Sequence, residues 1–164
     1  MKEDRKIDPE KIEMVSLKTL QGNISGENID PKSIKGYTYG FIVGTGIDPE
    51  QRIVGIELTV NIQAVGHGDK DLPVSGSYKH EAVFHVENLD DFIDIQEGEQ
   101  LPILDALMNA TLIGIAFSTV RGIIYSRTQG TLLNTVILPV VDPKKLASAP
   151  ESTPAENGPV AHEN

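Results

Sequence analysis

Residues 104–143 constrain the fold of this chain more than any other stretch. No charged residue occurs between Asp105 and Arg121, and the glycine of the sequence TQGT, Gly130, follows nine residues after Arg121. We predict a long helix that ends at this glycine, followed by an extended apolar segment over residues 132–141. A helix that is apolar nearly all round must be covered on more than one side. Its own sheet can supply one cover, and the second cover suggests another subunit.

Small residues recur at every fourth position of the predicted helix, from Ala106 to Gly122. Positions four apart form a ridge on a helix, so these residues make a smooth strip that another backbone can approach closely. Arg121 lies beside the strip, and a buried guanidinium needs a carboxylate or carbonyl partner. We therefore interpret Arg121 as a structural anchor, at a subunit contact or a helix end, rather than as a catalytic group. The predicted oligomer interface comprises Ala110, Gly114, Ser118, Arg121 and Gly122.

Four segments before the helix have the alternation typical of strands: residues 11–21, 36–47, 53–65 and 75–86. The third alternates most cleanly, with apolar and polar residues on opposite faces. In the first, the apolar positions change parity after Met14, which predicts a bulge or a strand with partners on both faces. Residues 22–35 are rich in turn formers and are expected to form a loop.

These patterns predict an α+β fold. A four-stranded antiparallel meander is packed by one long C-terminal helix, which is followed by an apolar connecting loop and a short terminal helix. The acidic stretch 87–99 leads into the long helix, whose positive N-terminal end it would favour. We expect a flexible N-terminus over residues 1–10, one domain over residues 11–146, and a disordered C-terminal tail over residues 147–164, where three prolines and no apolar periodicity occur.

Composition excludes several classes of function. With 24 acidic and 14 basic residues, the net charge of −10 disfavours nucleic-acid binding. The absence of cysteine excludes disulfides and thiolate chemistry. The N-terminal sequence MKEDRKIDPEK has no apolar core and is not a secretory signal. The uncharged run of about 15 residues is shorter than the roughly 20 that a spanning helix needs. We therefore expect a cytoplasmic protein with no membrane insertion.

No motif indicates a catalytic residue, a cofactor or a metal site. The glycines of residues 40–46 lack the Lys-Ser/Thr of a phosphate loop and lie within a strand pattern. His80 and His85 are five apart on one strand, so they should point to opposite faces and cannot chelate one ion together. His67 lies in an acidic loop tip of the kind that is usually only solvated. The expectation is a protein that is not an enzyme.

The remaining chemistry is apolar surface. Tyr37, Tyr39 and Phe41 form an aromatic row on one face of the second strand, and residues 132–138 form an apolar arm without helical spacing. Both can be ordinary core. Together they can also line a groove for an extended peptide, where backbone pairing supplies affinity and apolar pockets supply mild preference.

The run FSTVRGIIYSRTQGTLLNTVILPVVDPKKL, residues 117–146, resembles the end of SecB-type protein-export chaperones. The order of predicted elements also agrees with that family over residues 11–146, and FHVENLDDF resembles the family's exit from the fourth strand; the front half otherwise matches only in pattern. The matching positions in the C-terminal run are Phe117, Arg121, Arg127, Gly130, Leu138, Pro139, Val141 and Asp142.

The resemblance implies an ATP-independent holdase that binds unfolded or precursor polypeptides for export. It implies a homotetramer, a dimer of dimers with the long helices at the tetramer interface, and the SecA motor as a further partner. It also implies a groove for client polypeptides. On this sequence the client-binding groove comprises Tyr37, Tyr39, Phe41, Leu133, Val136, Ile137 and Leu146.

The chain departs from the export-type pattern in two places. Where the first strand of export members tends to be acidic, residues 18–23 read KTLQGN, and the last helix is much shortened. A SecB-like chaperone that guards an antitoxin is therefore an alternative. An adaptor for one folded partner and a hot-dog-type enzyme or ligand carrier are further hypotheses. The enzyme is disfavoured because the central helix has no carboxylate between Asp105 and Arg121.

Overall fold

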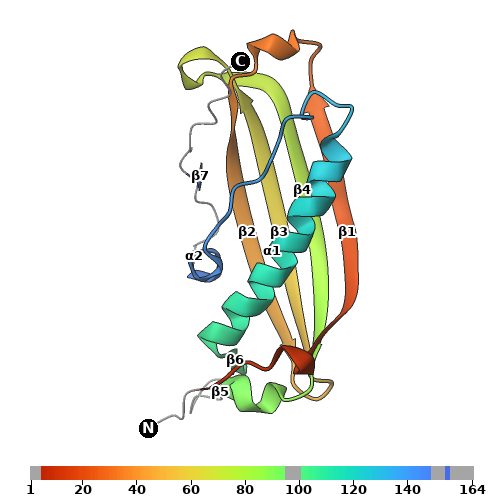
Figure 1. The fold of residues 1–164 in the computed structure, drawn as a ribbon, viewed down its shortest axis with the longest axis vertical. Coiled ribbons are helices and arrows are strands. Elements are labelled where there is room, and N and C mark those ends of the chain that lie inside the picture. The colour runs from red at the N-terminus through yellow and green to blue at the C-terminus, as the bar shows by residue number, and fades with distance from the viewer. Residues whose placement is uncertain (1–4, 95–100, 149–153, 156–164) are drawn as a thin grey trace.

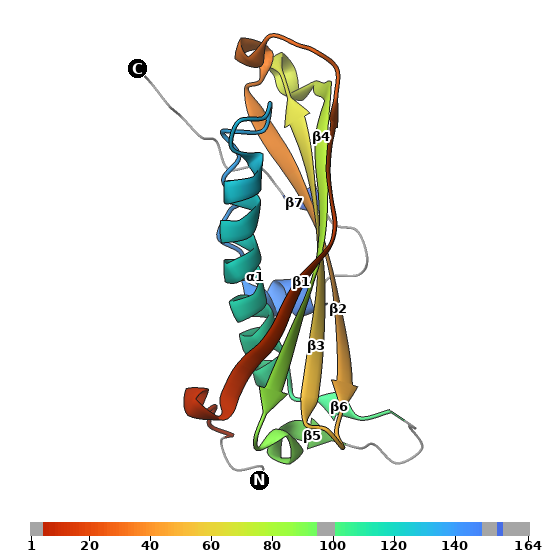
Figure 2. The same ribbon diagram turned by 90° about the vertical axis from the view of Figure 1, so that its right-hand side faces the viewer.

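A twisted antiparallel sheet forms one layer of the molecule, and a single long helix lies across one of its faces (Figures 1 and 2). The computed structural model describes residues 5–94, 101–148 and 154–155 of the chain. The strands are β1 (Ile12–Gly26), β2 (Gly36–Asp48), β3 (Ile53–Val65), β4 (Asp71–Val86), β5 (Ile93–Asp94), β6 (Ile103–Leu104) and β7 (Pro154–Ala155), and the helices are α1 (Ala106–Thr128) and α2 (Pro143–Ser148).

The strand order in the main sheet is β1-β4-β3-β2-β7, and every pairing is antiparallel. The predicted four-stranded antiparallel sheet is confirmed, and β2, β3 and β4 form a meander. The first strand is the exception, because β1 pairs with β4 and not with β2. Residues 27–35 connect β1 to β2 across one end of the sheet (Figure 1), and this connection is long enough to leave β1 free to pair with the longest strand.

The first strand is longer than the alternation indicated. Residues 22–26, which the turn-forming composition assigned to a loop, continue β1 to Gly26 and pair with β4 from Tyr78 to Val74. The predicted irregularity is present, since the β1–β4 register shifts between Met14 and Ser16 and again between Thr19 and Gln21. Each shift moves the side-chain parity of the strand to the other face.

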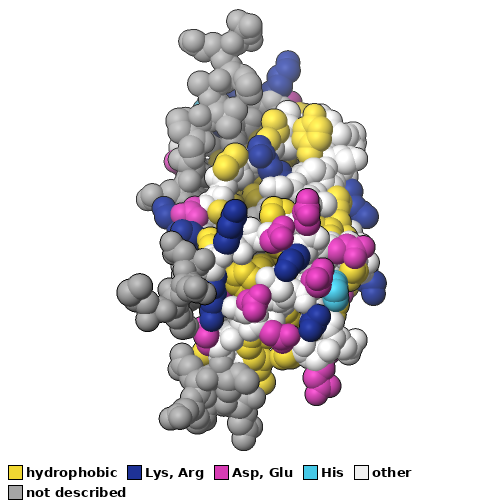
Figure 3. All heavy atoms as spheres, turned by 60° about the horizontal axis from the view of Figure 1, so that its bottom comes forward, with side chains coloured by type: hydrophobic (Ala, Val, Ile, Leu, Met, Phe, Trp, Pro, Cys, Tyr) yellow, Lys and Arg dark blue, Asp and Glu magenta, His cyan; other side chains and the backbone are white. Residues whose placement is uncertain are grey.

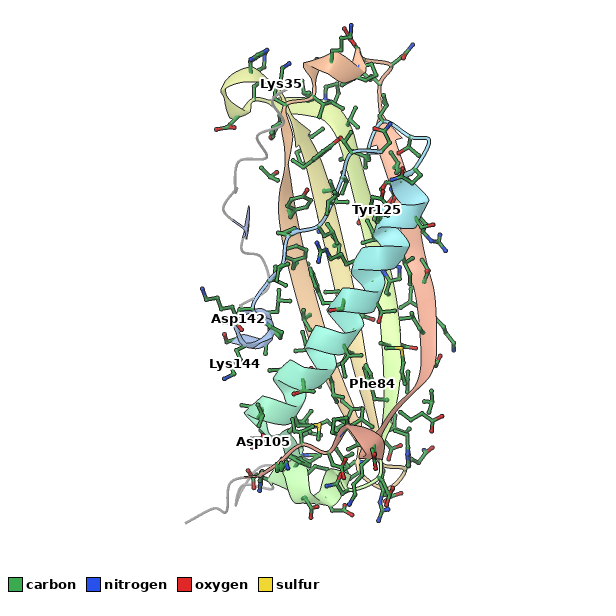
Figure 4. The ribbon with its side chains drawn as sticks, viewed as in Figure 1. Lys35, Phe84, Asp105, Tyr125, Asp142 and Lys144 are labelled. Carbon is green, nitrogen blue, oxygen red and sulfur yellow. The ribbon has the colours of Figure 1, made fainter. Side chains whose placement is uncertain are left out.

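The core lies between the sheet and α1. Alternate residues of β3 and β4 are buried on this face, from Val54 to Ala64 and from Val74 to Val86. Phe84, labelled in Figure 4, belongs to the part of the core nearest the start of α1, which also contains Met108 and Leu112. The opposite face of the sheet carries the polar alternates of β3, such as Glu57 and Asn61.

The start of α1 is fixed by charge. Asp105 is the N-cap, and its carboxylate accepts hydrogen bonds from the backbone N–H groups of Leu107, at 2.9 Å, and Met108, at 3.3 Å. Arg5 bridges Asp105, at 3.4 Å, and Asp94, at 3.1 Å. Acidic side chains with basic ones among them gather at this end of the molecule (Figure 3).

Helix α1 has 23 residues and is long and apolar enough, by length and composition alone, to cross a membrane. The argument against a spanning helix counted only the uncharged run, which stops at Arg121, whereas the helix itself continues to Thr128, close to the predicted stop at Gly130. In the structure Ile113, Val120 and Ile124 are buried in the core. These contacts are those of a core helix lying on a sheet.

Residues 129–142 leave the helix and run back over the sheet toward α2 (Figure 1). Gly130, with φ of +77°, makes the turn. The apolar connecting loop and the short terminal helix are thus confirmed. Of the tail predicted from residue 147, residues 147–148 complete α2 and Pro154–Ala155 form β7, while the others lie outside the described residues.

Candidate functional site

Two tyrosines of β2 hold the connecting segment, residues 129–142, against the sheet edge. The hydroxyls of Tyr37 and Thr135 are 2.7 Å apart, and the Tyr39 hydroxyl donates a hydrogen bond to the carbonyl oxygen of Ile137 at 3.3 Å. Burial, and then the neighbouring Tyr37, raises the pKa of Tyr39 to about 12. Its hydroxyl therefore stays protonated and remains a donor throughout the physiological pH range.

The aromatic row predicted on β2 continues onto the helix. The rings of Tyr39 and Phe41 are stacked at 6.4 Å between centroids, and Phe41 meets Phe117 of α1 edge-to-face at 5.4 Å. Both arrangements are favourable for aromatic quadrupoles. The row thus joins the edge of the sheet, the helix and the connecting segment into one apolar body.

Leu133 anchors the connecting segment in the core at a glycine of β4. A Cβ built on Gly76 would lie 2.8 Å from the Leu133 Cδ1 atom, closer than real side chains approach. Leu133 itself is fully buried. Glycine at residue 76 is therefore what allows the segment to approach the sheet so closely.

The residues predicted to line a client groove do come together, from β2, the connecting segment and α2. They do not form an open trough, because Phe41, Leu133 and Val136 are buried in the core. Tyr37, Tyr39 and Leu146 are half-buried against it. Of the seven, Ile137 alone is strongly exposed, at 59%. The assignment of these residues to client binding stays a prediction.

The most exposed apolar residue of this region is one that the sequence-based prediction missed. Val140 is 84% exposed and follows Ile137 along the same segment. An extended segment turns alternate side chains in opposite directions, so burial of Val136 and Leu138 places Ile137 outward. The alternation was visible in the sequence for Ile137, whereas Val140 follows Pro139, where the regular pattern is interrupted.

A groove of about 660 Å³ lies between α1 and the end of the connecting segment. Figure 4 labels Asp142 and Lys144, which form part of its wall opposite the helix. On the helix side, it is lined by four of the five residues predicted at an oligomer interface, Ala110, Gly114, Ser118 and Arg121. Gly122 lies outside it and is exposed, and no atom of the described residues lies within 4 Å of the position that a Cβ would take.

The small-residue strip is divided between two environments. A Cβ on Gly114 would lie 3.1 Å from the Cγ atom of Pro143, so this glycine lets the start of α2 pack closely on α1 within the same chain. Ser118 is exposed, as is Gly122. Only the second part of the strip is therefore open to another molecule.

Arg121 is half-buried in the wall of the groove. Among the residues that the structure describes, none makes a hydrogen bond or ion pair with its guanidinium. The anchor expected from the sequence is thus not satisfied within the described part of the chain. A carboxylate or carbonyl from another chain would satisfy it.

Both edges of the main sheet matter for what the molecule can bind. β1 is the outer strand on one side, and it exposes the apolar residues Val15, Leu20 and Ile24. β2 lies near the other edge, where β7 pairs with Tyr39 and Gly40 alone. The same stretch of β2, with parts of β3 and β4, lines a hollow of about 430 Å³.

One buried polar side chain lies apart from these surfaces. His80 of β4 is 1% exposed, and neither of its ring nitrogens has a hydrogen-bond partner among the residues that the structure describes. Burial, and then the charge of Arg127, lowers the pKa of His80. His85 is half-buried on the other face, as its spacing predicted. Within residues 5–94, 101–148 and 154–155, no three His, Asp or Glu side chains lie close enough to hold a metal ion.

Comparison with known proteins supports the fold through structure rather than sequence. Neither a protein-family model nor a curated protein matches this sequence. Among solved structures, the chain is similar to a SecB-like chaperone of Mycobacterium tuberculosis in complex with a ChAD peptide from the HigA1 antitoxin, with a TM-score of 0.56 and 16% sequence identity. The similarity covers 81% of this chain and 91% of that one. The chain therefore has a SecB-like fold.

Proposed function

We propose that this protein is an ATP-independent chaperone that binds extended, non-native polypeptide segments. The observation that carries the proposal is the outward pair Ile137 and Val140, held beside the edge of β2 by the Tyr39 hydrogen bond. Apolar residues next to the edge of a sheet suit an extended peptide, which gains backbone pairing and side-chain burial together. The similar structure from M. tuberculosis, which has this fold and binds a peptide, supports the same use.

Two biological settings fit this activity, protein export and the guarding of an antitoxin. The antitoxin peptide in the similar structure favours the second. The first strand points the same way, because β1 has Lys18 and carries a single acidic residue, Glu13. Delivery to the SecA motor would use acidic residues on the sheet, and this chain does not supply them on β1. We propose a cytoplasmic location for either setting.

We further propose that the chain assembles as a tetramer, a dimer of dimers. The side of α1 that faces away from the sheet exposes Leu107, Ile115 and Tyr125 next to Ser118 and Gly122. Tyr125, labelled in Figure 4, stands on the last turns of α1. Exposed apolar side chains on one helix face suit a helix-to-helix subunit contact, and the small residues beside them allow close approach.

The test is suppression of aggregation without ATP. Several unrelated proteins are refolded from denaturant in the presence of the chain, and light scattering at 360 nm follows their aggregation. A general holdase slows all of them at stoichiometric amounts. An adaptor for one folded partner slows none, and that result would reject the proposal of a general chaperone.

A further inference from the structure

The edge of β2 is occupied by a segment from the far end of the same chain. Pro154 pairs with Gly40 and Ala155 pairs with Tyr39, in antiparallel orientation. These two pairs extend the sheet by a fifth strand, β7. Figure 1 shows β7 beside β2, on the side away from β3.

β7 pairs with the part of β2 that lies next to the exposed apolar residues of the connecting segment. Tyr39 pairs through its backbone with Ala155, while its hydroxyl holds the carbonyl oxygen of Ile137. A peptide that covered Ile137 and also paired with β2 would therefore need the edge positions that β7 takes. The two cannot occupy the same backbone groups, because each N–H and C=O of an edge strand pairs with one neighbour.

The pairing of β7 with β2 is weak. It involves two residue pairs out of a strand of 13 residues, and Pro154 has no backbone N–H to donate. In sequence, Pro154 follows Ser148, the last residue of α2, by six residues, so β7 pairs with β2 within one chain. A short intramolecular connection gives an effective concentration in the millimolar range, enough to populate a weak contact that a competitor can still displace.

We infer that β7 is an intramolecular occupant of the peptide-docking edge of β2 and that client peptides displace it. The competition with client peptides rests on the proposed function, whereas the pairing of β7 with β2 does not depend on it. The C-terminal segment acts as a placeholder: it covers the edge next to Tyr39 when no client is bound, which limits edge-to-edge association of empty molecules. Clients that pair with more of β2 than two residues replace it.

Two variants of the full chain test the inference. One ends after Ser148, and the other carries Ala155→Pro, which removes a backbone N–H from β7 while keeping the length and charge of the tail. The matched control is removal of residues 156–164, which retains β7. Hydrogen–deuterium exchange over residues 36–48 reports the pairing of β7 with β2, and fluorescence anisotropy of labelled, reduced and carboxymethylated α-lactalbumin, a permanently unfolded chain, reports client binding.

We expect faster exchange in β2 for the truncation and for Ala155→Pro, and no change for the control. We also expect the truncation to bind the unfolded chain about three- to tenfold more tightly. In wild type, only the molecules whose β2 edge is free can bind, so the apparent affinity is the intrinsic affinity multiplied by that fraction. If hydrogen exchange in β2 is unchanged in both variants, β7 does not pair with β2 in solution. If exchange is faster but the affinity for the unfolded chain is unchanged, β7 does not compete with clients. If the unfolded chain bound to neither form, the proposed function and the competition would both fail, while the exchange data would still decide whether β7 pairs with β2.

Discussion

Leu133 packs over Gly76 so closely that a Cβ at residue 76 would lie 2.8 Å from the Leu133 Cδ1 atom. This contact fixes how the segment after the helix approaches the sheet, and the segment in turn presents Ile137. A glycine in the middle of a long strand thus determines the position of a candidate binding surface about sixty residues later in the chain.

We predict that Gly76→Val destabilises the protein by about 1–3 kcal/mol, because the added side chain overlaps that of Leu133, which is itself fully buried. Urea denaturation followed by circular dichroism measures the change. Gly55→Val is the matched control on the neighbouring strand, since no atom lies within 4 Å of the position that its Cβ would take. Equal stability of Gly76→Val and wild type would contradict the packing described.

The small-residue strip yields a prediction about assembly. Ser118→Leu and Gly122→Leu should lower the molar mass measured by multi-angle light scattering, since bulky groups there would separate the exposed faces of two helices. Gly114→Leu is a poorer test, because it would also push Pro143 and α2 away from α1 in the same chain. The tetramer proposal fails if wild-type protein is a monomer at micromolar concentration. An unchanged mass in both variants would place the contact elsewhere.

The unpartnered His80 predicts a pH dependence of stability. Its pKa is lowered in the folded state, first by burial and second by the charge of Arg127, so the unfolded chain binds the proton more readily. Stability contributed by the neutral ring is therefore fully present above the unfolded pKa of about 6.5 and is lost as pH falls below it. The loss reaches at most about 1.4 kcal/mol per pH unit for one proton.

His80→Leu should remove this pH dependence, and urea midpoints measured between pH 7 and pH 5 report it. His85→Gln, on the opposite face of the same strand, is the control and should keep the slope of wild type. A wild-type midpoint that does not fall over this range would show that protonation of His80 is not what limits stability at low pH.

Individual strands and helices were predictable because the patterns that define them lie among neighbouring residues in the sequence. The alternation of β3 gave its bounds, Ile53–Val65, since one face is buried and the other polar along the whole strand. The end of α1 at Thr128 followed from the glycine at residue 130, which adopts the positive φ that ends many helices. The short terminal helix was also predicted, and α2 begins at Pro143, a residue type that is favoured in the first turn of a helix.

Pairing partners and exposure were not predictable, because they depend on residues far apart in sequence. β1 carries no feature that distinguishes β4 from β2 as its neighbour, and its glycine-rich end looked like a loop until pairing with β4 satisfied its backbone. Leu133 and Ile137 are equally apolar, yet one is fully buried and the other exposed. The burial of Leu133 depends on Gly76 of the facing strand, which lies far away in the sequence. The two residue pairs of β7 have no pattern of their own.

The most direct test of the proposed function measures the binding of an unfolded chain to variants of the outward apolar pair. Anisotropy of labelled, reduced and carboxymethylated α-lactalbumin is titrated with wild type, with Ile137→Asp/Val140→Asp, and with Leu101→Asp, an exposed apolar control that precedes α1 in the chain. Loss of about 1.5–3 kcal/mol for each buried apolar side chain would weaken binding at least tenfold in the double variant. We predict that loss of affinity for the double variant, together with wild-type affinity for Leu101→Asp and unchanged urea midpoints. Equal affinity of wild type and the double variant would contradict it.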